Sequence, residues 1–149
     1  MSIVTKHRLE DMLAASPSRM VVMLYDEALG ALRTSVMAIA SGDIECRCNC
    51  VTAVLEIVGH LYLCLDEKQG GEVACNLGAI YGHIISRMPL VNLYNDTEVA
   101  EEAIGLLEML RDAWIELDAR IADGTADLSI DPAVIAAASQ AERTAARNG

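Results

Sequence analysis

Apolar residues recur in alternating steps of three and four along four long stretches of the chain, and this spacing constrains the fold more than any other feature. The most regular series consists of Ile44, Cys48, Val51, Leu55, Val58, Tyr62 and Leu65. Such steps place side chains on one face of an α-helix, whereas a half-buried strand would alternate at every second residue. Because no segment has the pattern of a strand, we predict an all-α fold.

Turn-forming residues separate the four predicted helices. Ser16 and Pro17 indicate a helix start, because serine accepts hydrogen bonds at an N-cap and proline needs no amide donor in the first turn. The expected helices run from this start to about Ala40, from Asp43 to about Glu67, from Gly71 to Asn95, and from about Glu98 to Ala122. Long helices joined by short turns predict an antiparallel four-helix bundle.

Three further features complete the predicted organisation. Pro89 lies inside the third apolar pattern, so we expect a kink or an end near Arg87 to Met88. A short amphipathic segment precedes the first helix, and an Ala-rich tail helix from Pro132 to about Arg147 follows a polar loop. We therefore expect one domain over residues 1–149, with its core at about residues 16–122 and the loop and tail at 123–149.

Composition and charge exclude several classes of partner. The chain of 149 residues has a formal net charge of −11, with 22 acidic and 11 basic residues, whereas nucleic acids and anionic membranes bind clustered lysine and arginine. No apolar run approaches the roughly 18 residues of a membrane-spanning helix, and the first residues lack the order of a secretory signal. We therefore expect a cytoplasmic protein with no nucleic-acid or membrane partner.

Several short motifs follow one another over about Ala14 to Leu117. They are Ser16-Pro17 with Met23 to Leu29, the turn from Leu65-Asp66 to Gly70-Ala74, Asn76-Leu77 with Tyr81, Asn92 followed by Asp96, and Leu110 to Trp114. In this order and spacing they resemble the flagellar secretion chaperone family FliS. The agreement of several motifs on four helices is more specific than any one of them.

This resemblance implies a cytosolic chaperone without enzymatic activity. It would bind the disordered C-terminal segment of flagellin, prevent premature polymerisation, and assist delivery to the flagellar type III export apparatus, with a homodimer left open. In that family flagellin wraps around a helical bundle and places helical pieces in apolar grooves. The predicted groove residues are Leu24, Tyr25, Ala28, Ala74, Leu77, Tyr81, Ile85, Met88, Leu107, Leu110 and Trp114. Leu9, Met12 and Leu13 are the predicted N-terminal cover of this groove.

The third helix carries two apolar stripes, and only one of them is expected to face the groove. One stripe consists of Val73, Leu77, Ile80 and Ile84, and we interpret it as the core side. The other consists of Ala74, Tyr81, Ile85 and Met88, and we interpret it as a groove wall. The spacing leaves the opposite assignment open. It also allows Tyr25, Tyr81 and Trp114 to be core residues with their polar atoms at the edge.

Cysteines suggest a metal site that the rest of the sequence does not support. Cys46, Cys48 and Cys50 lie close together in the second predicted helix. Thiolates at positions i and i+4 share a helix face and would bind zinc together with a histidine from elsewhere. Structural zinc takes four ligands in a recognisable spacing, such as paired Cys-x-x-Cys, and this spacing is missing. We predict reduced thiols, no metal and no other cofactor.

The alternative function is histidine phosphotransfer in a signalling relay, because such histidines also occur on four-helix bundles. His60 and His83 lie in separate predicted helices among apolar residues. His60 is followed by Leu-Tyr-Leu, with no basic residue nearby to hold a phosphoryl group, which disfavours this alternative. No Ser-His-Asp grouping, phosphate-binding glycine loop or carboxylate pair indicates catalysis, so we predict that the protein is not an enzyme.

Overall fold

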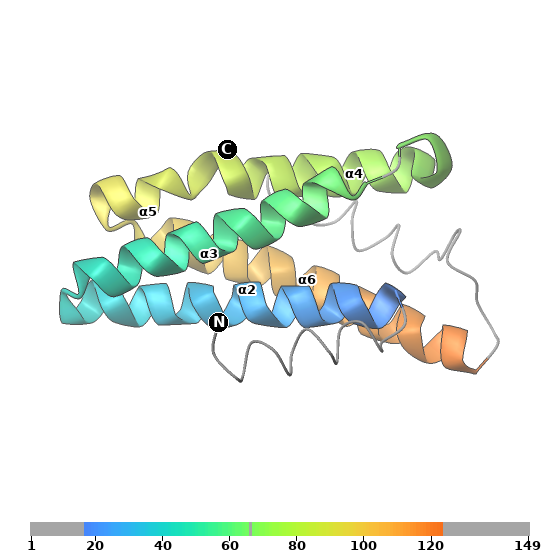
Figure 1. The fold of residues 1–149 in the computed structure, drawn as a ribbon, viewed down its shortest axis with the longest axis horizontal. Helices are drawn as coiled ribbons and strands as arrows, with labels where there is room; N and C mark the ends of the chain where they lie inside the picture. Colours follow the sequence, from blue (N-terminus) through green and yellow to red (C-terminus); the bar gives the residue numbers. More distant parts are fainter. Residues whose placement is uncertain (1–16, 66, 124–149) are drawn as a thin grey trace.

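The computed structural model describes residues 17–65 and 67–123, and every regular element within them is helical (Figure 1). The helices are α2 (Pro17–Ser41), α3 (Ile44–Leu63), α4 (Glu67–Arg87), α5 (Pro89–Tyr94) and α6 (Thr97–Ala122). Helices α4 and α5 together form the third long stretch of the sequence. The predicted all-α four-helix bundle is confirmed. The predicted N-terminal cover, Leu9, Met12 and Leu13, and the predicted tail helix lie outside the described residues.

The turn between α2 and α3 follows the expected chemistry. Gly42 has a positive φ of 72°, a conformation that glycine adopts at little cost. Asp43 is the N-cap of α3, and its side chain accepts a hydrogen bond of 3.0 Å from the backbone amide of Cys46. The two helices therefore reverse direction within a few residues.

Helix α3 ends at Leu63, earlier than the predicted Glu67. The backbone amides of Cys64 and Leu65 donate to the carbonyls of His60 and Tyr62 at 3.1 and 3.2 Å, which closes the last turn. Helix α4 is interrupted at Gly71, whose φ of 54° and ψ of −130° are not helical. The glycine pair of the sequence thus marks a kink inside the first turns of α4.

Pro89 divides the third stretch as predicted. Helix α4 ends at Arg87 and α5 begins at Pro89, where the missing amide donor costs nothing in a first turn. Asn95 ends α5 in the left-handed conformation, with a φ of 52°. The Asp96 side chain then accepts a 3.2 Å hydrogen bond from the amide of Val99 in the first turn of α6.

Helix α2 packs closely along both α3 and α6, whereas the described Cα atoms of α2 and α4 all lie more than 8 Å apart. The buried core lies between the helices and takes residues from each of them; its largest fully buried side chains include Tyr25, Leu29, Leu32, Val51, Val54, Ile80, Tyr81, Ile84, Met88, Leu106, Leu107 and Leu110. No helix in residues 17–65 or 67–123 is both long and apolar enough to cross a membrane.

Candidate functional site

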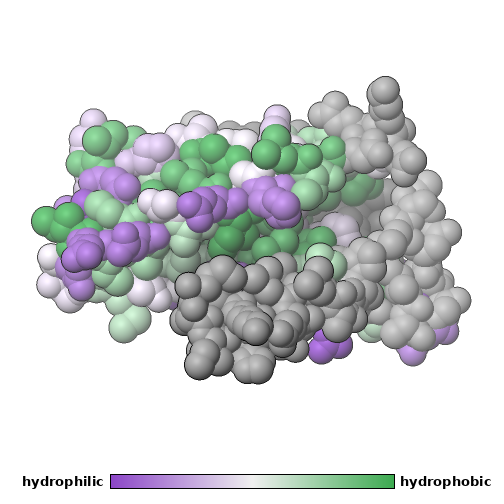
Figure 2. Space-filling view, viewed as in Figure 1, coloured by the Kyte–Doolittle hydropathy of each residue, from purple (hydrophilic) through white to green (hydrophobic). Residues whose placement is uncertain are grey.

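An apolar pocket opens between α2, the end of α3, α4 and α6. Its cavity volume is about 250 Å³, and it is lined by Val21, Leu61, Cys64, Leu65, Gly70, Val73, Ala74, Leu77, Tyr81 and Trp114. The lining contains no Asp, Glu, Lys, Arg or His. On the face shown in Figure 2, apolar residues lie along α4 and between α3 and α2, with hydrophilic residues between these two areas. The pocket is therefore suited to apolar groups.

Small residues at the start of α4 leave the space that the pocket occupies. Gly70 and Ala74 line the pocket, and a Cβ atom added at Gly70 would come within 2.7 Å of the Ala74 Cβ. A larger side chain at Gly70 would therefore displace Ala74. The described Cα atoms of α2 and α4 lie more than 8 Å apart, so neither of these two helix backbones fills the gap.

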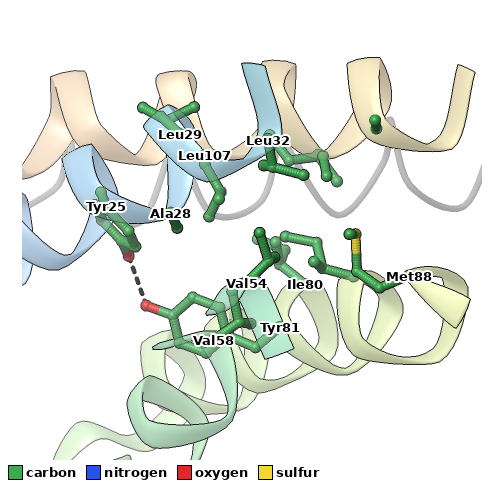
Figure 3. Packing of buried hydrophobic residues seen from close by; sticks show 14 of the residues in the cluster. Tyr25, Ala28, Leu29, Leu32, Val54, Val58, Ile80, Tyr81, Met88 and Leu107 are labelled. Atoms are coloured by element: carbon green, nitrogen blue, oxygen red, sulfur yellow. Dashed lines mark hydrogen bonds between the residues drawn. The ribbon is translucent and has the colours of Figure 1, made fainter. Parts of the chain in front are cut away.

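Two buried tyrosines connect α2 to α4 at this pocket. The hydroxyls of Tyr25 and Tyr81 are hydrogen-bonded at 2.5 Å, and the ring centroids lie 6.5 Å apart at 54° (Figure 3). Tyr25 is completely buried and Tyr81 is 2% exposed, although Tyr81 still contributes to the pocket lining. The pair spans a distance that the two backbones leave open.

Burial sets the acidity of both phenols. It raises the pKa of Tyr81 to about 12, although the hydrogen bond with Tyr25 opposes the rise. The pKa of Tyr25 is raised well above its usual value, mainly by burial and secondly by the charge that Tyr81 would carry. Both groups are therefore neutral hydrogen-bonding phenols at physiological pH.

Trp114 lines the pocket from α6 and is partly buried. Its indole nitrogen is buried and has no hydrogen-bond partner of ordinary geometry among the described residues. This nitrogen lies near the Tyr25 hydroxyl and lowers the pKa of Tyr25. Its effect on that pKa is smaller than the effects of burial and of Tyr81. The ring thus presents its apolar surface to the pocket, with the nitrogen directed into the protein.

The structure brings only part of the predicted groove together. Ala74, Leu77, Tyr81 and Trp114 line the pocket. The other predicted groove residues belong to the core: Tyr25, Ala28, Met88, Leu107 and Leu110 are buried, and Leu24 and Ile85 are partly buried against it. The role of all eleven residues in lining a flagellin-binding groove stays a prediction.

Six pocket residues were absent from the predicted groove; they are Val21, Leu61, Cys64, Leu65, Gly70 and Val73. Val73 had been assigned to the core stripe. The two stripes of the third stretch do not separate into a core side and an open side, because Tyr81 and Met88 are as buried as Ile80 and Ile84. The open part of α4 is its N-terminal half, and the signal in the sequence was the glycine pair followed by Ala74.

Polar side-chain contacts connect α6 to α2 and to α4. Arg111 pairs with Asp26 of α2, which raises the pKa of the guanidinium. Arg33 of α2 contacts Glu108 at 2.7 Å. His83 of α4 pairs with Glu102 of α6, and their side chains are 18% and 16% exposed. His83 is therefore engaged in the fold rather than presented as a free imidazole for phosphotransfer.

The cysteines and His60 are the remaining reactive side chains among the described residues. All five cysteines are free thiols. In the part of the chain that the structure describes, no group of three or more His, Cys, Asp or Glu side chains is arranged to hold a metal ion. The His60 ring nitrogen lies 3.6 Å from the Cys64 sulfur, one helical turn along α3.

Comparison with known proteins places most of the chain in one family. The family model described as flagellar protein FliS matches residues 3–121. The flagellar secretion chaperone FliS of Salmonella typhimurium is 33% identical over 106 residues, which cover 70% of this chain and 78% of that protein. The Campylobacter jejuni FliS is 34% identical over 102 residues, or 68% and 80% of the two chains. The Bacillus subtilis FliS is 27% identical over 110 residues, or 74% and 81%.

Proposed function

The chain belongs to the FliS family of flagellar secretion chaperones, and we propose that it binds the disordered C-terminal segment of flagellin. Bound in this way, flagellin is kept from polymerising early and is delivered to the flagellar type III export apparatus. The observation that carries the proposal is the uncharged, apolar pocket between α2 and α4. The proposed activity is binding alone, without catalysis or a cofactor.

The size of the pocket fits anchoring side chains better than a whole ligand. At about 250 Å³ it is smaller than the roughly 300–1,000 Å³ of typical small-molecule sites. An amphipathic helix lying over the pocket would insert apolar side chains spaced three or four residues apart. A segment that orders on binding loses conformational entropy, so a long contact surface is needed in addition to this anchor.

Two exposed apolar side chains that are neighbours in sequence of pocket residues are proposed as part of such a surface. Leu63 is 82% exposed in the last turn of α3, between the pocket residues Leu61 and Cys64. Ile115 is 40% exposed on α6 and follows Trp114 directly. Exposed apolar groups around an apolar pocket are typical of protein-binding sites.

The test is calorimetric titration of the full chain with a peptide copying the C-terminal segment of a flagellin. We expect binding at tens of micromolar or tighter and an increase in helical circular dichroism on binding. Val73→Glu should weaken binding at least tenfold, because it places a charge at the pocket wall; tenfold corresponds to about 1.4 kcal/mol.

Ala79→Glu is the matched control. Ala79 is exposed on the same helix and does not line the pocket, so the substitution adds the same charge away from the pocket. It should bind the peptide as the unmodified chain does. Absence of peptide binding to the unmodified chain would refute the proposed function. Equal binding by the unmodified chain and by folded Val73→Glu would exclude the pocket as the binding site.

A further inference from the structure

The three clustered cysteines of α3 lie in two different environments. Cys46 and Cys50 both line a shallow cavity of about 400 Å³ at the start of the helix. Cys48 instead faces Arg47, whose Nη2 atom lies 3.8 Å from the Cys48 sulfur. The cluster therefore contains one pair of thiols and one separate thiol.

The geometry of the paired thiols disfavours a disulfide between them. Cys46 and Cys50 are one helical turn apart and line the same cavity. Residues at i and i+4 of a helix have Cβ atoms about 5–6 Å apart, whereas a disulfide needs about 3.5–4.5 Å. Since a disulfide would require the first turns of α3 to unwind, an atom that bridges the two sulfurs fits this geometry better.

The surroundings of the pair favour a cation. Asp43 and Glu45 line the same cavity, and its lining includes no Lys, Arg or His. The nearest basic side chain along α3, Arg47, is held by the side-chain oxygens of Asn92 in α5 and of Asn95 at the end of that helix. The cavity therefore combines two soft donors with negative charge.

The number of donors decides which cation fits. A structural zinc ion takes four ligands, and the described residues offer no group of three or more at this or any other place. Soft thiolates select Cu(I), zinc and iron–sulfur clusters. Zinc and the clusters take four protein ligands, whereas Cu(I) is satisfied by two thiolates. We propose that Cys46 and Cys50 form a two-thiolate site for a soft monovalent metal ion of the Cu(I) class.

Binding at this site involves no change of oxidation state. Each thiol releases its proton to solvent as its sulfur bonds to the ion, and copper remains Cu(I). The site lies at the opposite end of α3 from the apolar pocket, which uses Leu61 and the residues after it. The inference is therefore independent of the proposed flagellin binding.

The experiment is an anaerobic titration of the fully reduced chain with Cu(I) held by a chromophoric chelator. The loss of chelate absorbance should show one Cu(I) transferred per chain. Cys46→Ser and Cys50→Ser should each weaken binding at least tenfold. Cys48→Ser and Cys64→Ser are the matched controls and should retain the affinity of the unmodified chain, Cys64 because its partner is His60.

Circular dichroism establishes that each variant is folded. Cys46→Ala and Cys50→Ala provide a second pair of variants, because alanine favours the helix more than serine does. Loss of affinity in both pairs supports the site. Unchanged affinity in folded Cys46 and Cys50 variants, an equal loss in Cys48→Ser, or no transfer to the unmodified chain would overturn it.

Discussion

Helix α2 meets α6 and α4 in two different ways. Towards α6 the backbones pack closely, and the Asp26–Arg111 and Arg33–Glu108 ion pairs lie along the contact. Towards α4 the backbones stay apart, and the bridge is made by the Tyr25 and Tyr81 side chains. The apolar pocket lies on this second side.

The difference shows how a bundle can be stable and still keep an apolar surface available. The α2–α6 contact supplies buried area and closes the fold. The α2–α4 contact relies on long aromatic side chains, and small residues such as Gly70 and Ala74 leave the remaining space unfilled. A binding surface of this kind costs stability only on the side where the partner is expected to bind.

Matched truncations on the two sides should give the largest effect. Leu107 of α6 is completely buried, so Leu107→Ala should lower the free energy of unfolding by about 2–5 kcal/mol. Leu65 is only partly buried at the pocket, and Leu65→Ala should cost less than about 1.5 kcal/mol because less apolar area is lost. Urea unfolding measures both values. Equal losses would mean that the pocket side is packed as tightly as the α6 side.

The tyrosine bridge should have the next largest effect. Tyr25→Phe and Tyr81→Phe each leave one buried hydroxyl without its partner, which costs about 1–3 kcal/mol. The double variant removes both hydroxyls and should lose less than the sum of the single losses. Chemical denaturation of the four proteins gives the coupling energy. Strict additivity would show that the hydroxyls do not stabilise each other.

The dependence of stability on alkaline pH tests the same pair of tyrosines, because deprotonation places a charge on a buried phenol. Because burial raises the pKa of Tyr81 to about 12, the native state keeps a proton that the unfolded state loses above about pH 10. The stabilisation is complete below pH 10 and decreases as the pH rises towards 12. At pH 11 the loss from Tyr81 should be about 1.4 kcal/mol, measured by unfolding across pH 9 to 11. Tyr81→Phe should show a shallower decrease, and an equal slope would contradict this assignment.

The exposed ion pair on the α6 side should have the smallest effect. The side chains of Arg33 and Glu108 are 57% and 49% exposed, so Glu108→Gln should change stability by less than about 1 kcal/mol. The change should shrink further at high salt, which screens the pair. Thermal unfolding at low and high salt measures it. A loss above about 2 kcal/mol would contradict this expectation and would show that the pair contributes substantially to the stability of the α2–α6 contact.

The sequence predicted the helices well because their signals are local. Steps of three and four, the Asp43 cap and the break at Pro89 all act within a few residues, and the structure contains each of them. The end of α3 was placed too late because the apolar series continues to Leu65 after the helix has ended at Leu63. The spacing of apolar side chains does not show where the backbone leaves the helix and forms a turn.

The site was less predictable because it depends on distances between helices. Tyr81 and Val73 belong to different stripes of α4, yet both line the pocket. Which residues line an opening is decided by the separation of α2 and α4, and no spacing within one helix encodes that separation. The same holds for the three cysteines of α3. Cys46 and Cys50 share a cavity with Asp43 of the α2–α3 turn, whereas Cys48 contacts Arg47.

The fluorescence of Trp114 provides the most direct test of the central claim, that a flagellin segment binds in the apolar pocket. Trp114 is the single tryptophan of the chain and lines this pocket, so a tryptophan-free peptide copying a flagellin C-terminal segment should exclude water from the ring. The account predicts a shift of the emission to shorter wavelength that saturates at the same peptide concentration as the calorimetric heat. Saturable heat with unchanged Trp114 emission would contradict it.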